Sequence, residues 1–595
     1  MASASTLLQL LATAAASAAG ATTGLRFVDR REAATLLTWR ELHRRAAEVG
    51  AALQKLGVGR GERVGLVYPT GPEFFFGFFG ALAAAAVPVP LYPPVRLGRL
   101  DEYHERTAAM LRAASARLVL ADRTVGRLLG ESIEHARPAL GCRTLDDLPP
   151  NSGLPVGTLV SPDELALVQF SSGTTVAPKP VALSHRAILA QVRALNALWP
   201  AVPGGQQRGV SWLPLYHDMG LIGCVFPALA LITDLTLIGP EVFVTRPAVW
   251  LRAISRYQAT ISPAPNFAYG LCVEKIRDEE LAGVDLSSWR VALNGAEAVS
   301  GHTARAFIER FSRWGFRPEA MTPVYGLSEA ALAVSFSFIT RPFRSGTYAR
   351  STLAPGEIAV PEPNGTEVVS VGQPLPGFEI EVRDDAGLPC QERQVGRIWI
   401  RGPSLMTGYL DQPEATAKAL VAGWLDSGDL GFVADDELYL TGRAKDLVIL
   451  RGRNYPPEEI ERCLDGAPGV RVGCTAATSW LPDQGEREEL VVFVEAARDA
   501  GEPVRAALPE TVRAAVLAAT GLPVDQVVVA EPGTLPRTSS GKIRRGETLR
   551  LWLAGALEAP APVSALRLAA AFARSTFAHR RARKQARSDD GAGTR

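Results

Sequence analysis

The sequence predicts an α/β protein with more than one domain. Its 595 residues are too many for a single hydrophobic core, so two or three domains are expected. Between residues 37 and 129, strand-like apolar runs alternate with helical patterns, which is typical of a largely parallel sheet covered by helices. After residue 378, alternating apolar and polar residues predict antiparallel strands instead.

Composition and charge exclude several classes of protein. The chain is 47% hydrophobic and 21% charged, which describes a globular protein, and its net charge of +1 argues against a nucleic-acid partner held by bulk electrostatics. Six cysteines are scattered, with no Cys-x-x-Cys pair and no histidine at ligand spacing. We therefore expect a reduced, cytoplasmic protein without a structural metal.

Two apolar segments resemble targeting or membrane sequences. Residues 1–21 are small and apolar, but no basic residue precedes Arg26, which predicts an opening helix and not a signal peptide. Residues 74–95 carry no charge, yet four prolines interrupt them, and the unbroken part is shorter than the roughly 20 residues that a membrane span needs. We expect a buried helix followed by a strand, and no transmembrane segment.

In chain order, the first elements alternate between helix and strand. A helix opens near residue 37, a strand covers residues 64–68, and a second strand covers residues 118–121. Residues 144–163 form a polar connection rich in proline and glycine.

A hydroxyl-rich loop follows an apolar strand at residues 165–170. Ser184 is the expected N-cap of the next helix. Strand, loop and helix together predict a phosphate cradle, in which backbone N–H groups and hydroxyls donate to an anion. It is not a Walker A loop, because no Gly-Lys-Ser/Thr ends it. The alternative is an ordinary Ser/Thr-rich surface turn. The candidate anion-binding residues are Ser171, Ser172, Gly173, Thr174, Thr175 and Lys179.

Residues 210–223 place a histidine and an aspartate before an apolar stretch that carries no charge. This arrangement suits a polar gate at the mouth of an apolar tunnel, and the alternative is a purely structural histidine. The candidate substrate residues are His217, Asp218, Met219, Gly220 and Ile222.

Two further motifs follow strand-like runs. Residues 291–297 form a strand that ends in a tight turn at Asn294, Gly295 and Ala296. Residues 324–330 bring an aromatic ring, a glycine, a hydroxyl and a carboxylate together. The alternative for this second motif is a helix start capped by Ser328.

The later motifs lie on either side of a predicted domain boundary. Residues 341–370 form a segment that is too long for an ordinary loop. Asp429 lies in a Ser-Gly-Asp sequence, where an aspartate usually serves only to form the turn. Lys542 is flanked by serine and glycine, which leaves it free to enter a site on another domain. Beyond residue 558 the chain becomes Ala-rich and then basic. A frayed helix or solvated tail is expected there, with a weak membrane-surface or partner contact as the alternative.

Six motifs in this order resemble the adenylate-forming superfamily, which comprises acyl-CoA synthetases, fatty acyl-AMP ligases and peptide-synthetase adenylation domains. The resemblance covers about residues 25–550. Residues 210–223 and 341–370 are most similar to the fatty acyl-AMP ligase branch. Val176 and Pro180 stand where the family usually has glycines, and both changes stiffen the loop.

The resemblance implies a fold and a division into domains. A large N-terminal domain, residues 1–441, would combine α/β sheets with a small β-barrel-like region and carry the ligase-type insertion at residues 341–370. A small, mobile α+β domain would span residues 442–558, with Lys445 as the hinge, and residues 559–595 would form a basic, flexible tail.

The resemblance also implies roles for the candidate residues. Lys542, Glu329 and His217 would be catalytic, and Glu329 would also hold Mg²⁺ through oxygen. Asp429 would bind both ribose hydroxyls, Arg443 would reach the nucleotide, and Tyr325 can stack on a purine. The remaining nucleotide-binding residues would be the loop residues named above together with Asn294, Gly295, Ala296, Gly326 and Ser328.

The implied reaction uses ATP and Mg²⁺ to join a fatty acid to AMP, and then transfers the acyl group to the phosphopantetheine thiol of an acyl carrier protein. An acyl-CoA synthetase is the nearest alternative. A weakly active or non-catalytic nucleotide-binding homologue is a further one, favoured only by Val176 and Pro180.

Overall fold

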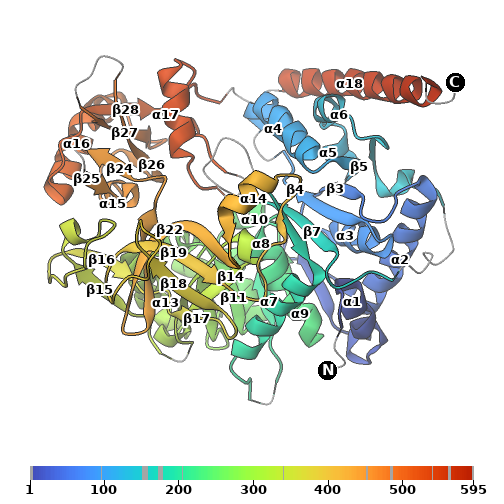
Figure 1. The fold of residues 1–595 in the computed structure, drawn as a ribbon, viewed down its shortest axis with the longest axis horizontal. Helices are drawn as coiled ribbons and strands as arrows, with labels where there is room; N and C mark the ends of the chain where they lie inside the picture. Colours follow the sequence, from blue (N-terminus) through green and yellow to red (C-terminus); the bar gives the residue numbers. More distant parts are fainter. Residues whose placement is uncertain are drawn as a thin grey trace.

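The computed structural model describes residues 4–94, 97–150, 159–171, 179–203, 205–339, 341–450, 453–482, 487–538, 541–560 and 565–592. A large N-terminal domain carries a smaller C-terminal domain on one side, and a long final helix lies on the other side (Figure 1). The mixed α/β fold class is confirmed, with sheets of both kinds in the order that the sequence patterns predict.

The first sheet is fully parallel, as the alternating pattern predicts. Its strand order is β4 (Val87–Leu91), β3 (Arg63–Val67), β5 (Ala116–Ala121) and β6 (Cys142–Arg143). Its helices are α2 (Trp39–Leu56), α3 (Pro72–Ala83), α4 (Leu100–Ala113), α5 (Arg123–Gly126) and α6 (Gly130–Ala136). Helix α3 is the buried helix expected in the apolar segment, and its Phe75 and Phe78 are fully buried. None of the described helices is long and apolar enough to cross a membrane.

The second sheet has nine strands and positions much of the candidate site. Its order is β17 (Gln373–Pro374), β14 (Ala333–Phe336), β13 (Met321–Gly326), β12 (Val291–Asn294), β11 (Ile261–Ala264), β9 (Gly209–Ser211), β10 (Leu235–Ile238), β1 (Gly24–Val28) and β2 (Ala34–Thr38). The strands from β13 to β1 are parallel, whereas β14, β17 and β2 run antiparallel to their neighbours. Because β12 and β13 are parallel neighbours, the turns that follow them lie at the same edge.

Several helices accompany this sheet. They are α10 (Pro240–Thr245), α11 (Ala248–Arg256), α12 (Asn266–Lys275) and α13 (Gly301–Phe311). Together with the sheet they bury a cluster rich in aromatic side chains, including Trp250, Tyr269 and Phe307.

The hydroxyl-rich loop connects two antiparallel strands, which corrects the expectation that it runs directly into a helix. Strand β7 (Leu165–Phe170) pairs with β8 (Pro180–Ser184), and β8 also pairs with β20 (Gly408–Tyr409). The buried residues 181–183 need backbone partners, and pairing on both sides supplies them. Ser184 is the N-cap of α7 (His185–Leu198), as predicted, and its hydroxyl accepts a hydrogen bond from the N–H of Ala187.

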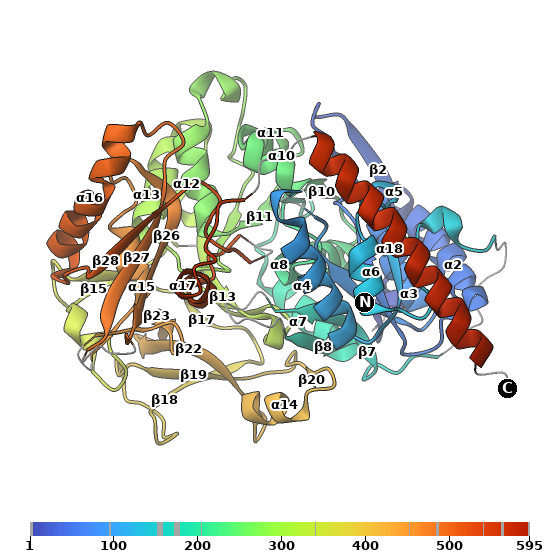
Figure 2. The same cartoon turned by 90° about the horizontal axis from the view of Figure 1, so that it is seen from above.

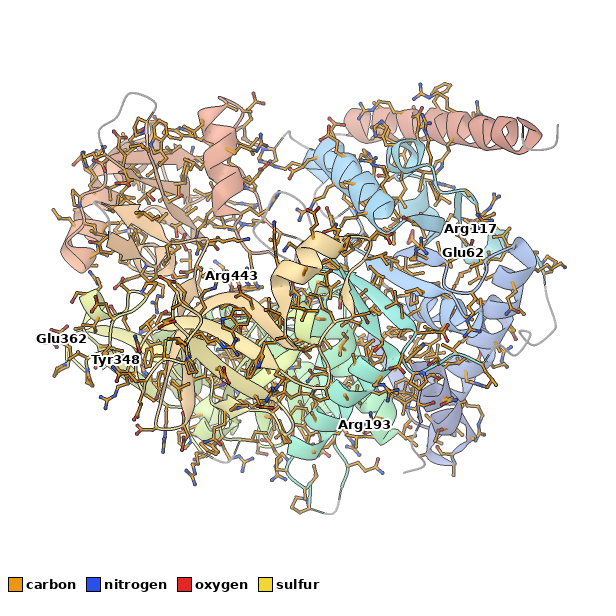
Figure 3. The ribbon with its side chains drawn as sticks, viewed as in Figure 1. Glu62, Arg117, Arg193, Tyr348, Glu362 and Arg443 are labelled. Atoms are coloured by element: carbon orange, nitrogen blue, oxygen red, sulfur yellow. The ribbon has the colours of Figure 1, made fainter. Side chains whose placement is uncertain are left out.

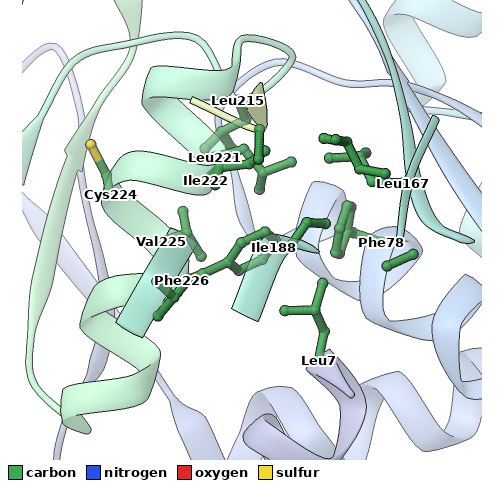
Figure 4. Packing of buried hydrophobic residues seen from close by; sticks show 14 of the residues in the cluster. Leu7, Phe78, Leu167, Ile188, Leu215, Leu221, Ile222, Cys224, Val225 and Phe226 are labelled. Carbon is green, nitrogen blue, oxygen red and sulfur yellow. The ribbon is translucent and has the colours of Figure 1, made fainter. Parts of the chain in front are cut away.

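The main apolar core lies between this hairpin and the N-terminal elements. Figure 4 shows Leu7, Phe78, Leu167 and Ile188 packed beside residues of the helical segment that follows Asp218. Leu7 and Leu11 are fully buried in α1 (Leu7–Ala16), so the opening helix predicted near the N-terminus is confirmed.

The region expected to be barrel-like is a five-stranded antiparallel sheet. It contains β18 (Glu379–Arg383), β19 (Gly396–Arg401), β22 (Trp424–Ala434), β21 (Leu420–Val421) and β23 (Glu437–Arg443), with α14 (Pro413–Ala419) beside it. Strand β23 runs through the expected domain boundary between residues 441 and 442, and it pairs with β22 as far as Asp429 and Arg443.

The small domain is α+β. Its three-stranded sheet has the order β26 (Val470–Trp480), β27 (Glu489–Ala496) and β28 (Gln526–Ala530), and β24 (Val448–Leu450) pairs separately with β25 (Arg453–Tyr455). Its helices are α15 (Pro457–Arg462), α16 (Glu502–Thr520) and α17 (Arg545–Leu553).

The end of the chain differs from the expected solvated tail. Residues 565–592 form helix α18 (Ala565–Ala592), which lies across α5 and α6 of the large domain (Figures 1 and 2). Ala571, Ser575 and Ala578 are buried in this contact. The sequence contained the signal, an alanine-rich helical stretch, but nothing in it identified the surface on which the helix packs.

Candidate active site

The turn after β12 brings bare backbone to the edge of the nine-stranded sheet. Asn294 is fully buried, and its amide Nδ2 donates to Oδ1 of Asn266 at 3.3 Å. A Cβ on Gly295 would lie 2.7 Å from Val324, and Ala296 has a positive φ of 65°. The predicted tight turn is therefore confirmed, and only a small residue fits at Gly295.

A tyrosine, an aspartate and an arginine meet beside this turn. The hydroxyl of Tyr325 donates to Oδ2 of Asp429 at 2.7 Å, and Nε of Arg443 lies 3.0 Å from Oδ1 of the same carboxylate in an ion pair. They come from β13, β22 and β23, and Arg443 lies near the junction of the two domains (Figure 3). The Asp429 carboxylate raises the pKa of Arg443, despite the opposing effect of burial. Each carboxylate oxygen keeps a lone pair for a further donor.

The two motifs that contain His217 and Ser328 also meet. The hydroxyl of Ser328 donates to Oδ2 of Asp218, and Nδ1 of His217 lies 2.7 Å from Oδ1 of Asp218. Ser328 is therefore not a helix cap, because its short 3₁₀ helix begins after Leu327 without a side-chain cap. Burial acts to raise the pKa of Asp218, but His217, Ser328 and the N–H of Met219 together lower it to about 2. The carboxylate is an anion held in place on both oxygens.

Glu329 and Lys179 are linked through a tyrosine that sequence reasoning did not single out. The hydroxyl of Tyr409 donates to Oε1 of Glu329 at 2.9 Å, and Nζ of Lys179 lies 4.4 Å from the centre of the Tyr409 ring. Burial raises the pKa of Glu329. Tyr409 ends the Gly-rich stretch at residues 402–409, and pairing of β20 with β8 carries it to the loop. Its place in that stretch was the only sequence signal.

The neck of the hydroxyl-rich loop is closed by the backbone. The N–H of Ser171 donates to the carbonyl of Lys179 at 3.1 Å, and Phe170 pairs with Pro180. Five residues singled out in the loop, Ser172, Gly173, Thr174, Thr175 and Val176, lie outside the described residues. The structure places only the two ends of the candidate phosphate cradle.

Lys542 comes from the small domain and faces the charged groups of the large domain. Its own N–H donates to Oγ1 of Thr538 at 3.0 Å, and Gly541, just before it, has a φ of +94°. Burial and then the positive charge of Arg443 lower the pKa of Lys542, while Glu297, Asp218 and Asp429 act to raise it. These influences place the amino group within electrostatic range of all four side chains.

Comparison with known proteins agrees with this constellation. Residues 15–410 match the family described as "AMP-binding enzyme". The chain belongs to the AMP-binding enzyme family.

Its relatives are similar over almost their whole length. The AMP-binding enzyme is 35% identical to a putative acyl-CoA synthetase of Caulobacter vibrioides over 90% of this chain and 94% of that one. It is 36% identical to a medium-chain-fatty-acid–[acyl-carrier-protein] ligase of Moorena producens, over 88% and 90%. A structure from studies of fatty acyl-adenylate ligases from E. coli and L. pneumophila superposes with a TM-score of 0.85 at 33% identity, over 92% of this chain and 98% of that one.

The donor set of this AMP-binding enzyme fits Mg²⁺ in a shared site. No group of three or more metal-ligating side chains occurs among the residues described. Mg²⁺ in nucleotide sites typically takes one or two carboxylates together with phosphate oxygens, and it keeps several waters. Glu329 offers one such carboxylate next to Lys179 at the end of the loop, so the residues present fit a metal held jointly with a nucleotide.

The residues predicted to form a polar gate begin an irregular helix in this AMP-binding enzyme. Helix α8 (Asp218–Gly220) passes into a π-helical turn at Leu221–Val225 and then into α9 (Phe226–Leu231). A Cβ on Gly220 would lie 2.2 Å from the carbonyl oxygen of Pro214. Met219 packs in the aromatic cluster and Ile222 in the main core (Figure 4), so this helix divides two apolar regions.

The insertion at residues 341–370 folds and contacts the small domain. Its strands β15 (Ser345–Tyr348) and β16 (Thr366–Val369) form an antiparallel pair. Arg350 forms an ion pair with Glu459, which also accepts from Oγ1 of Thr366 at 2.6 Å, and Arg350 donates to the carbonyl of Ala519 at 2.8 Å. Glu459 is only 9% exposed, so the insertion and the small domain share a nearly buried ion pair.

Proposed function

We propose that this AMP-binding enzyme activates a fatty acid with ATP, forming acyl-AMP and pyrophosphate, and then transfers the acyl group to the phosphopantetheine thiol of an acyl carrier protein. The observation that carries the proposal is that Lys542, from the small domain, lies within electrostatic range of Asp218, Asp429 and Arg443 of the large domain, whose side chains are joined to Ser328 and Tyr325. A lysine in that place can hold two anions together, the fatty-acid carboxylate and the α-phosphate of ATP.

The chemistry needs charge neutralisation and no general base. A carboxylate is already ionised near neutral pH, so the difficulty is to bring it to a polyanion and to stabilise the transition state. Lys542 donates towards the reacting oxygens, and Lys179 donates towards the phosphates from the neck of the loop. When bound, Mg²⁺ on Glu329 supplies further positive charge for the phosphates.

The other residues bind and orient the nucleotide. The backbone of residues 294–296 lies along adenine, Tyr325 stacks on it, and Asp429 accepts from the ribose hydroxyls while Arg443 holds that carboxylate. Ser328 and the loop hydroxyls donate to phosphate, and the His217–Asp218 pair lies between the nucleotide and the acyl chain. The proposed nucleotide-binding set is Ser171, Ser172, Gly173, Thr174, Thr175, Lys179, Asn294, Gly295, Ala296, Tyr325, Gly326, Ser328, Asp429 and Arg443.

The second half-reaction is proposed to follow rotation of the small domain about Lys445. This residue is exposed and lies between β23 and β24, in the segment that joins the two domains. The ligase from Moorena producens named above supports a carrier protein as acceptor. Docking of the insertion on the small domain supports the same acceptor, because it restricts the orientations that the small domain can adopt.

The proposed location is the cytoplasm. None of the six cysteines forms a disulfide in the structure, which suits a reducing compartment where disulfides are rare.

The decisive test is ATP–pyrophosphate exchange with fatty acids of graded chain length, followed by acceptor competition. We expect exchange to depend on the fatty acid and on Mg²⁺. When CoA and a phosphopantetheinylated carrier protein are both supplied, the carrier should receive most of the acyl groups. Exchange without dependence on any fatty acid would contradict the proposed activation. Acyl-CoA formed as fast as acyl-AMP would instead identify an acyl-CoA synthetase, as the name of the Caulobacter relative suggests.

A further inference from the structure

Helix α18 returns to the large domain after the chain has passed through the small domain. The last helix of the small domain, α17, ends at Leu553, and α18 then lies along α6, near the other end of the molecule (Figures 1 and 2). The chain is therefore anchored to the large domain on both sides of the small domain, at the hinge and again at α18.

The contact between α18 and α6 is close and largely made by small residues. Ala571, Ser575 and Ala578 are at most 5% exposed and lie on one face of α18 at helical spacing. The N–H of Gly130 donates to Oγ of Ser575 at 2.8 Å, and a Cβ on Gly130 would lie 2.0 Å from the Ser575 carbonyl oxygen. The two backbones touch at this point, and a larger side chain on either helix would separate them.

Charged groups on either side of these buried residues pair with opposite charges on α6. Arg574 pairs with Glu131 at 3.0 Å, and Arg581 pairs with Glu134 at 2.7 Å. A ring nitrogen of His579 lies 2.8 Å from the carbonyl oxygen of Gly126. The ion pairs are partly exposed and add little stability, but they set the register of α18 on α6.

A second contact joins the two domains where the small domain ends. Arg99 precedes α4. Its Nη2 donates to three carbonyl oxygens: that of Thr534 at 2.8 Å, that of Glu558 at 3.0 Å and that of Gly533 at 3.4 Å. These acceptors belong to the small domain and to the segment that leads to α18, and the Arg99 side chain is 18% exposed. Arg99 therefore holds the start of the segment that leads to α18 against the large domain.

We propose that α18 and Arg99 form a tether that holds the small domain in the orientation seen here, with Lys542 at the nucleotide site. The inference rests on the proposed rotation of the small domain. Rotation would break the Arg99 contacts, whereas α18 would stay on α6 and limit the displacement. The twelve residue-to-residue steps from Leu553 to Ala565 span at most about 40 Å when fully extended. The Arg99 contacts exist in only one orientation and shift the population towards it, and the anchor at α18 narrows the range of other orientations. The tether therefore favours adenylate formation over thioester formation.

The test measures domain orientation directly and does not depend on activity. Spin labels are attached through ketone-bearing residues at Val244 in α10 and Val472 in β26, which are exposed on the large and small domains. This chemistry avoids the six native thiols. Pulsed dipolar spectroscopy then gives the distance distribution in the full chain, in a chain ending at Pro560, and in Arg99→Ala.

We expect one dominant distance in the full chain. We expect the fraction of molecules outside that peak to rise about threefold or more when α18 is removed. Ser575→Leu, which cannot approach Gly130, should behave like the truncation in a chain of full length. The matched control is Phe577→Ala, because Phe577 is 61% exposed on α18 and should leave the distribution unchanged. Unchanged distributions in the truncated chain and in Ser575→Leu would overturn the tether.

A parallel measurement of acyl-AMP formation separates this proposal from the proposed function. If no variant and no parent protein forms acyl-AMP, the proposed function fails while the distances still decide the tether. If acyl-AMP forms, single-turnover transfer from preformed acyl-AMP to a carrier thiol should be about threefold faster without α18.

Discussion

At the scale of single residues, the candidate site is made of pairs in which one group positions another. Asp218 is held by His217 and Ser328, Asp429 by Tyr325 and Arg443, and Glu329 by Tyr409. Each carboxylate therefore has a defined direction before any substrate binds. Because these groups are already oriented, less rearrangement of charged and polar groups is needed to stabilise a charged transition state.

Lys542→Ala is expected to lower the rate of acyl-AMP formation at least about a hundredfold, which corresponds to roughly 2.7 kcal/mol. The physical reason is the loss of the cation that holds the carboxylate and the α-phosphate together. The measurement is ATP–pyrophosphate exchange. Lys418→Ala, on the exposed surface of α14, is the matched control. The variant should still transfer the acyl group from supplied acyl-AMP to a thiol. Near-normal exchange in a folded Lys542→Ala protein would contradict the catalytic role proposed for Lys542.

Tyr409→Phe is expected to lower turnover about tenfold, because a hydrogen bond to a charged group contributes roughly 1.5–3 kcal/mol. The variant keeps the ring beneath Lys179 and removes only the donor to Glu329. The measurement is the Mg²⁺ titration of acyl-AMP formation, in which half-saturation should shift.

The matched control is Tyr257→Phe, because the buried Tyr257 hydroxyl has no hydrogen-bond partner among the residues that the structure describes. If both tyrosine variants titrate like the parent protein, Glu329 does not depend on Tyr409 and the proposed metal position must be abandoned.

At the scale of elements, the β7–β8 hairpin holds the hydroxyl-rich loop and is also linked to the N-terminal helix α1. Helix α7 begins directly after β8, and its first residue, His185, is 3% exposed. Nδ1 of His185 accepts a hydrogen bond from the N–H of Leu7 at the start of α1, at 3.2 Å. The hairpin is thereby tied to the N-terminal helix through a neutral imidazole.

This tie predicts a loss of stability in acid. Burial lowers the pKa of His185 from 6.5 to about 4, although Glu164 acts to raise it. Between these values the unfolded chain takes up a proton that the folded chain does not. The stabilisation is therefore complete above 6.5 and is lost as the pH falls to about 4. From about pH 7 to about pH 5, this group should cost the large domain about 2 kcal/mol of unfolding free energy.

The measurement is denaturant unfolding of the parent protein and of His185→Gln at both pH values. The variant lacks the titration and should show a smaller loss between the two conditions. His302→Gln, exposed in α13, should lose as much as the parent protein. Equal losses in all three proteins would show that His185 does not titrate on unfolding.

At the scale of the whole molecule, the arrangement of the domains depends on contacts far from the chemistry. The insertion meets the small domain through Arg350, Thr366 and Glu459, on a side remote from α18 in Figure 1. The small domain is thus held at the insertion, at Arg99 and at the hinge.

Arg350→Ala is expected to relax the choice of acceptor. Removal of Arg350 leaves the nearly buried Glu459 without its cation, and breaking such a pair typically costs about 3–5 kcal/mol of interface stability. The small domain should then reach more orientations, and the ratio of acyl-CoA to acyl-carrier product should rise at least about threefold.

The measurement is product partition with both acceptors present. Arg401→Ala breaks an exposed ion pair with Glu379 in the antiparallel sheet and should leave the ratio unchanged. An unchanged ratio in Arg350→Ala would restrict the insertion to a structural role.

The sequence by itself determined the local structure and the family. Apolar runs at residues 165–170 and 291–294 became strands because side-chain pattern and burial depend on a few neighbouring residues. The N-cap at Ser184 and the buried helix α3 follow from equally local chemistry. The motifs also placed the chain among adenylate-forming enzymes before any geometry was known.

Only the tertiary structure decided which distant groups meet. Tyr409 reaches Glu329 across 80 residues of sequence, Ser328 reaches Asp218 across 110, and Gly130 meets Ser575 across 445. Strand β8 exists because it pairs with β7 and β20, and α18 is ordered by the surface of α6. Contacts of this kind depend on the packing of whole domains, and no periodicity in a single stretch of sequence encodes them.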